Sequence, residues 1–270
     1  MTGNREEARP GVAPGAYGSA ATMFAALYGE LEPHPWRDPN SDRDAYVVFH
    51  DRSVAMGWID ETAGGLWGMN DAGCDHPLAA PKIPLAAWFQ VEMEPVGGER
   101  PMPVQPFLRC AGDVATRLGV LSLQAVQILL PVHGLDASSR PAYAPIPSLL
   151  TAEWFGDSDP QSRTPVRVTL DSGQASSLSS AAPHLQEQID RLDQNVFVCE
   201  SRSPAEHDPL AIQPPFEGSF WNGPPLHRAT FHGTLAEWSL DVLGWLGGFL
   251  TDLSAQHGVT TPLLLTASRS

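Results

Sequence analysis

The chain is poor in the residues that mark nucleic-acid-binding and membrane-surface proteins. Lys82 is the single lysine among 16 basic residues, and 31 acidic residues give a formal net charge of −15. Phosphate backbones and anionic lipid surfaces repel such a chain, so we expect it to bind neither nucleic acid nor membranes. The scarcity of lysine beside plentiful arginine is typical of a GC-rich bacterial genome.

Cysteines and long apolar runs are also scarce. Cys74, Cys110 and Cys199 are odd in number and far apart, which predicts reduced thiols in the cytoplasm and no disulfide framework. No apolar run reaches the roughly 18 residues of a membrane-spanning helix. Residues 1–10 carry charges where a signal peptide needs an apolar core. We therefore predict a cytoplasmic protein.

The common catalytic motifs are missing. The sequence contains no nucleophile elbow, phosphate-binding glycine loop, dinucleotide fingerprint or two-histidine zinc motif. This lowers the expectation of a common hydrolase, kinase or dehydrogenase, and leaves room for an enzyme on a less marked scaffold.

Hydrophobic residues make up 42% of the chain, which is enough for a substantial core. Composition and periodicity predict a mobile tail and an α+β protein of two similar halves. The proposed divisions are a tail at 1–18, an N-terminal half at 19–140, a connecting segment at 141–162 and a C-terminal half at 163–270.

The C-terminal half predicts the element order β-α-β-β-α-β, which is the ferredoxin-like order. Alternating apolar residues indicate strands near 166–170 and 228–232, and 196–199 and 263–266 form two more. The spacing of Thr234 and Glu237 is typical of a capping box, which predicts a helix from 234 to Gly258. We attribute Gly244 and its neighbouring helix glycines to close packing by another element of the same chain.

The N-terminal half is less regular. We expect a helix at 19–31, a hairpin at 46–59, a strand at 85–93, a helix at 107–118 and a strand at 124–130. Asp113 precedes Gly119 by the same spacing with which Asp252 precedes Gly258. This weak repeat is compatible with a tandem duplication packed sheet to sheet, and equally with chance.

Two groups of residues are candidate sites. His232, Arg228 and Thr230 alternate on one side of a strand, with Arg167 and Thr169 expected beside them. They could bind an anion or supply an acid–base histidine, although a solvated sheet face has the same pattern.

Asp71, Cys74, Asp75 and His76 lie in a Gly-rich loop, where Cys74 and His76 are the candidate zinc ligands; a polar loop with one buried thiol and a turn-forming Asp has the same pattern. A second pair would have to come from elsewhere, with His50 and Asp51 as candidates. Since structural zinc takes four protein ligands and catalytic zinc three, we expect no metal, and nothing in the sequence implies a cofactor.

Two functions follow as hypotheses. The first is a non-catalytic protein that binds a protein partner through the aromatics of its Pro-rich loops, namely Phe216, Phe220 and Trp221. The second is an enzyme that holds a small organic molecule between the two sheets. That cavity would be lined by Arg228, Thr230, His232, Trp88 and Glu92.

Overall fold

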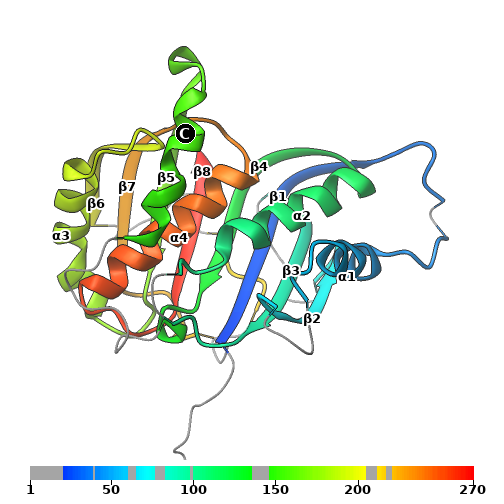
Figure 1. Ribbon diagram of the computed structural model, residues 1–270, viewed down its shortest axis with the longest axis horizontal. Coiled ribbons are helices and arrows are strands. Elements are labelled where there is room, and N and C mark those ends of the chain that lie inside the picture. Colours follow the sequence, from blue (N-terminus) through cyan, green and yellow to red (C-terminus); the bar gives the residue numbers. More distant parts are fainter. Residues whose placement is uncertain are drawn as a thin grey trace, which may run out of the picture.

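The computed structural model describes residues 21–38, 40–59, 65–76, 83–97, 100–135, 146–204, 212–216 and 221–270. These residues form one open antiparallel sheet of eight strands, in the order β2-β3-β1-β4-β8-β5-β7-β6 (Figure 1). The α+β class is thus confirmed. The expected tail at 1–18 lies outside the described residues.

The elements follow one another in two similar series. The first is β1 (Ala21–Pro33), α1 (Ala45–Ala55), β2 (Gly68–Gly73), β3 (Leu85–Met93), α2 (Val104–Leu118) and β4 (Gly119–Leu130). The second is β5 (Thr164–Asp171), α3 (Ser177–Arg191), β6 (Phe197–Pro204), β7 (Arg228–Leu235), α4 (Leu240–Gln256) and β8 (Leu263–Arg269). Three 3₁₀ helices lie between the series: η1 (Val132–Gly134), η2 (Pro147–Asp157) and η3 (Pro160–Ser162).

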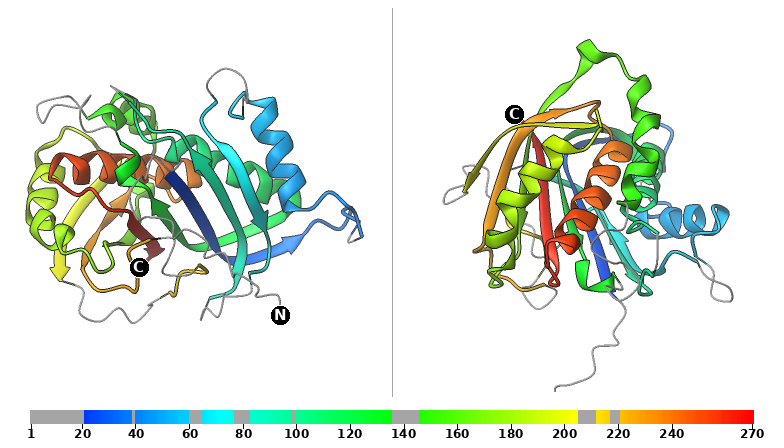
Figure 2. Two further views of the ribbon diagram at one scale, coloured as in Figure 1. Left: turned by 90° about the horizontal axis from the view of Figure 1, so that it is seen from below. Right: turned by 60° about the vertical axis from the view of Figure 1, so that its left-hand side comes forward.

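The four α-helices lie on one face of the sheet, as the two views of Figure 2 show. Side chains alternate along each strand, so β3 sends Phe89 to the helix side and Trp88 to the opposite side. Phe89 meets Phe49 of α1 there, with ring centroids 5.0 Å apart. The main core therefore fills the space between the sheet and its helices.

Helices α2 and α4 approach each other closely at two glycines. A Cβ on Gly244 would lie 2.6 Å from the Cα of Gln105, and one on Gly247 would lie 2.8 Å from Val104 Cγ1. Real Cβ atoms do not come so near, so a side chain at Gly244 would push the backbones of α2 and α4 apart, and one at Gly247 would displace the Val104 side chain. The packing of α2 on α4 within the chain accounts for both glycines.

The expectation that two sheets pack face to face is wrong. Strand β4 pairs with β8, from Ala125–Leu130 to Leu263–Ser268, so the two series of strands continue into each other as one sheet. These strands satisfy each other's backbone hydrogen bonds edge to edge, so the helix-free faces of the two series lie side by side in one sheet and do not face each other. No space between two sheets exists in the described residues.

The strand expected at 263–266 is confirmed as β8, and it lies in the middle of the sheet. It pairs with β4 on one side and with β5 on the other. Leu263 and Leu265 point to the helix side, and Leu264 points to the opposite side. All three are buried, as expected for a strand that is covered on both faces.

Two local expectations in the N-terminal half are wrong. Residues 21–33 form the strand β1 in place of a helix, and residues 45–55 form α1 in place of a hairpin. Strand β1 is buried on both sides, so its apolar run lacks strict alternation and imitates a helical pattern. Helix α1 begins at the N-cap Asp44, whose carboxylate accepts a hydrogen bond of 2.9 Å from Val47 N.

The start of the last helix also differs from the expectation. Thr234 belongs to β7, and α4 begins after Ser239, whose hydroxyl accepts from Val242 N at 3.2 Å. Strand pairing with β5 and β6 keeps Thr234 extended, which overrides the local capping-box pattern. The expected helix end is confirmed, because Gly258 adopts the left-handed conformation with φ +79°.

Candidate functional site

The candidate site lies where β1 separates from β3. The two strands pair as far as Tyr28 and Leu85, and beyond a bulge at Gly29 strand β1 pairs only with β4. Gly29 has φ +146°, and a Cβ there would lie 2.1 Å from the carbonyl oxygen of Ser122. The bulge therefore depends on glycine, and it opens a hollow of about 820 Å³ beside the sheet.

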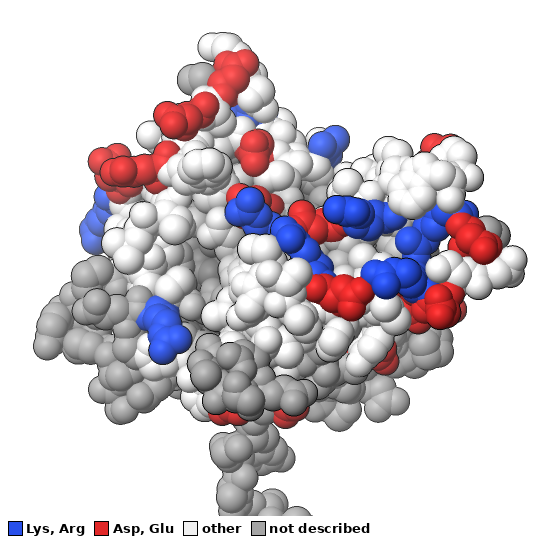
Figure 3. Space-filling model, turned by 45° about the vertical axis from the view of Figure 1, so that its right-hand side comes forward, with Lys and Arg blue, Asp and Glu red and all other residues white. Residues whose placement is uncertain are grey.

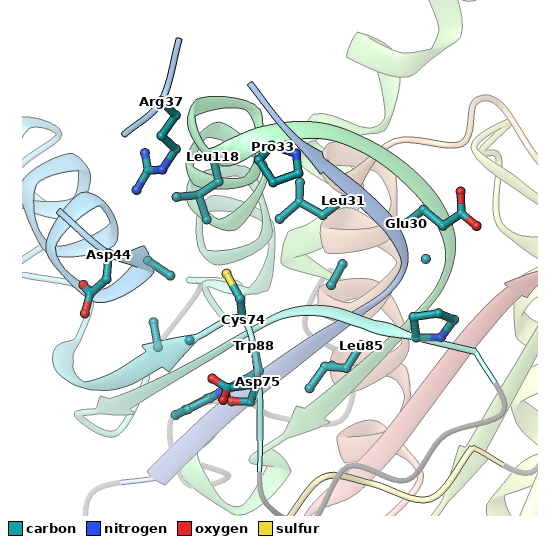
Figure 4. Close-up of a pocket in the computed structure, with 16 residues that line it drawn as sticks. Glu30, Leu31, Pro33, Arg37, Asp44, Cys74, Asp75, Leu85, Trp88 and Leu118 are labelled. Atoms are coloured by element: carbon teal, nitrogen blue, oxygen red, sulfur yellow. The ribbon is translucent and has the colours of Figure 1, made fainter. Parts of the chain in front are cut away.

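The hollow has an apolar floor and a charged rim (Figure 4). The floor includes Leu31, Leu85, Trp88 and Leu118. Arg37, Asp44, Cys74 and Asp75 lie around it, and Glu30 lines it too but extends its carboxylate away from the others in this view. A few polar groups above an apolar surface are typical of small-molecule sites.

The rim residues are held by neighbouring elements. Asp44 is fixed as the N-cap of α1, and the Arg37 guanidinium donates a hydrogen bond to the carbonyl oxygen of Arg43. The carbonyl oxygen of Asp75 accepts from Trp88 Nε1 at 2.6 Å, which ties the segment after β2 to β3. The Asp75 carboxylate itself makes no hydrogen bond or ion pair with another described residue.

Cys74 is an exposed residue whose surroundings disfavour the thiolate form of its side chain. Burial raises its pKa above the ordinary value, and the carboxylates of Asp75 and Asp44 raise it further, against an opposing effect of Arg37. The thiolate is the form that attacks electrophiles and binds metals. At neutral pH this side chain is therefore chiefly a protonated thiol.

Cys74 and His76 do not meet in one site. The His76 ring packs edge-on against Trp88 and Phe24, with centroids 5.1 and 6.4 Å apart, and it does not line the hollow. Burial lowers the pKa of His76. Asp51 of α1 is paired with Arg43 at 2.6 Å. Within the described ranges, no three His, Cys, Asp or Glu side chains gather into a metal-binding group.

The second predicted group does lie together on the helix-free face. Arg228, Thr230 and His232 of β7 stand opposite Asp171, Thr169 and Arg167 of β5 in register. Arg228 Nε donates to Asp171 Oδ2 at 2.5 Å, and the hydroxyls of Thr230 and Thr169 are 3.0 Å apart.

These polar pairs link β7 to β5 through their side chains. Asp171 is buried, and burial raises its pKa, while the bond from Arg228 lowers it. Thr230 is completely buried, and of the three predicted side chains Arg228 and His232 are partly exposed. Trp88 lies on β3, four strands away from β5, so the predicted five-residue cavity does not form.

Sequence reasoning identified Cys74 but missed the hollow around it. Two signals were available: a glycine inside an apolar run, which marks a bulge, and Asp44 before a helix. Arg37 carried no signal, because only the fold brings it near Cys74.

Comparison of the chain with protein-family models, with curated proteins and with solved structures finds no match in any of the three. Among the described residues, no helix has the length and apolar character to cross a membrane.

Proposed function

We propose that this is a non-catalytic protein that binds a partner protein through an arm formed by residues 146–162. The arm comprises η2 and η3, and it rises beyond the rest of the molecule (Figure 1). The observation that supports the proposal is Trp154, a tryptophan on this arm that is 73% exposed. Tryptophan is the residue type most enriched at the centres of protein interfaces.

The arm is anchored firmly at its root. Asp252 of α4 accepts hydrogen bonds from Ser148 N at 3.2 Å and from Ser148 Oγ at 2.5 Å. The Ser148 carbonyl accepts from Trp245 Nε1 at 2.8 Å, and Phe155 packs edge-on against the Trp245 ring. A fixed arm loses little conformational entropy when a partner binds, which favours affinity.

The chemistry of the arm indicates the kind of partner. Leu150 is 79% exposed and is a second exposed apolar side chain of η2. Glu153, Asp157 and Asp159 are exposed around them, and Figure 3 shows acidic side chains gathered over the projection. A matching partner has an apolar pocket bordered by arginine or lysine.

The aromatics named in the sequence-based hypothesis are not available for this role. Phe216 and Trp221 are only 7% and 6% exposed, and they pack against the helix-free face of the sheet with Phe24 and Trp88. Phe220 lies outside the described residues. Their burial leaves the protein-binding hypothesis in place and moves its surface to the arm.

Photo-crosslinking in the source bacterium tests the proposal. A photoreactive amino acid at position 154 should give one dominant adduct with another protein, and Trp154→Ala should abolish co-purification of that protein. Position 36 provides the matched control, because Trp36 is 72% exposed and lies on the loop before α1. Equal adducts from positions 154 and 36, or none from 154, would contradict the proposal.

A second candidate function is an enzyme that acts on a small organic molecule. The hollow beside Cys74 supports it, since a volume of about 820 Å³ accommodates such a substrate. The site lies within the N-terminal series of elements, and not between two sheets. Turnover of a small molecule that is lost on filling the hollow by Ala72→Trp would favour this function.

Two further proposals concern origin and compartment. We propose that the chain arose by duplication of a ferredoxin-like unit, because each series has the order β-α-β-β-α-β and places its strands in the order second, third, first, fourth. We also propose the cytoplasm as its location. The support is that all three cysteines are free thiols.

A further inference from the structure

We propose that the hollow at the β1 bulge binds a small organic ammonium ion with an apolar tail. This inference is independent of the arm and of any partner protein. It concerns the cavity lined by the floor and rim residues described above.

The floor fits the apolar part of such a ligand. Leu31, Leu85 and Leu118 present aliphatic side chains from three different elements, and Trp88 adds an aromatic surface. Removing an apolar tail from water against these groups is favourable in proportion to the area buried. The floor is formed by two strands and the last residue of α2, so it exists before a ligand arrives.

The rim favours a positive charge. Asp44 and Asp75 both line the hollow near Cys74 (Figure 4), with the Asp44 carboxylate turned to the N-terminus of α1, and among the described residues Arg37 is the one cation that lines it. The guanidinium of Arg37 already donates to a backbone carbonyl, whereas the Asp75 carboxylate has no partner among the described residues. Asp75 is exposed, so water hydrates its carboxylate, and a ligand ammonium would take the place of that water as a charge-assisted donor.

The pKa of Cys74 depends on the same nearby charges. Burial is the largest cause of the raised pKa of Cys74; among the nearby charges, Asp75 raises this pKa, Arg37 lowers it and Asp44 raises it again. A site that disfavours an anion at Cys74 also disfavours a carboxylate ligand. We therefore expect ammonium ligands to bind more tightly than carboxylate ligands of equal length.

Three probes of equal chain length separate the contributions of charge and tail. Calorimetric titration of the full chain should give the highest affinity for hexylammonium, a lower one for hexanol and the lowest for hexanoate. Bound hexylammonium should also slow alkylation of Cys74 by iodoacetamide, with Cys199 as the internal reference. Tighter binding of hexanoate, or binding of hexylammonium without protection of Cys74, would overturn the proposal.

Conservative variants identify the charges involved. Asp75→Asn should weaken hexylammonium binding by about two- to fivefold, the range for an exposed ion pair, and leave hexanol binding unchanged. Asp44→Asn should act in the same direction, and asparagine still caps α1. Glu30→Gln removes equal charge from a side chain that extends away from the rim. The proposal fails if Glu30→Gln weakens binding as much as Asp75→Asn does, or if no probe binds.

Discussion

Removal of the last strand should unfold the whole molecule. Truncation after Gly258 deletes β8, which lies between β4 and β5 in the centre of the sheet. Six residues of β8 pair with β4 and six pair with β5, so both neighbours lose a hydrogen-bonding partner together. The two series of elements would then share no strand pairing in the described structure.

The magnitude follows from the burial of three leucines. Leu263 and Leu265 are completely buried, and Leu264 is nearly so. Burial of a leucine side chain is worth about 1.5–3 kcal/mol, so the three contribute about 4.5–9 kcal/mol. A domain of ordinary stability unfolds at a cost of about 5–15 kcal/mol, so the truncated chain retains little or no net stability.

Urea unfolding, followed by near-ultraviolet circular dichroism, measures the effect. The truncated chain should show no cooperative transition, and Leu265→Ala should unfold cooperatively with a loss of about 2–5 kcal/mol. Deletion of residues 1–15 is the control, because that segment has no periodic apolar pattern and should change the midpoint little. A truncated chain that unfolds at the midpoint of the full chain would refute the reasoning.

Three further predictions address the polar pairs and the cysteine. Thr230→Val should destabilise the fold by about 1–3 kcal/mol because it leaves the buried hydroxyl of Thr169 without its partner, and the double valine variant should recover much of this loss in urea unfolding. Asp75→Asn should lower the pKa of Cys74, because a charge that opposes the thiolate is removed; the pH profile of iodoacetamide alkylation should shift to lower pH. An unshifted profile would show that Asp75 does not act on this thiol. The purified chain should contain no zinc, and elemental analysis that finds about one zinc per chain, lost on Cys74→Ser, would contradict this.

The type of secondary structure could be predicted best where the spacing of apolar residues along the segment matches one buried face. Strand β3 was predicted with its exact bounds, and α2 and the strand near 263 were also correct in type. Strand β1 was taken for a helix because Phe24, Leu27, Tyr28 and Leu31 match helical spacing by chance in a strand buried on both faces. The pattern of side chains along a strand does not indicate which other strand pairs with it. The pairing of β4 with β8 therefore could not be predicted from the sequence.

Helix α1 illustrates a second limit. Its buried positions are Ala45, Phe49 and Ser53, which have the four-residue spacing of a helix face. Only Phe49 is strongly apolar; Ser53 is buried, and its hydroxyl lies 3.5 Å from Cys110 Sγ. A helix that docks through small and polar residues gives almost no periodic signal.

In the candidate sites, too, local features could be predicted and contacts between distant segments could not. The alternation on β7 correctly placed Arg228, Thr230 and His232 on one face, since strand periodicity is local. It could not show that Asp171 neutralises Arg228, because that contact depends on strand register. The hollow near Cys74 depends on a bulge and on a helix that the sequence reading had assigned to a hairpin.

The pairing of β4 with β8 has a consequence for how the chain can change. Without this pairing, each of the two would be an edge strand of its own four-stranded sheet. A long edge strand with apolar side chains exposes unpaired backbone N–H and C=O groups, which promotes aggregation. Joined to each other, they hide both borders at once. Neither half could be released as an independent module during evolution without first acquiring charges, a proline or a new covering for that border. The pairing of β4 with β8 therefore also favours keeping the two halves in one polypeptide chain.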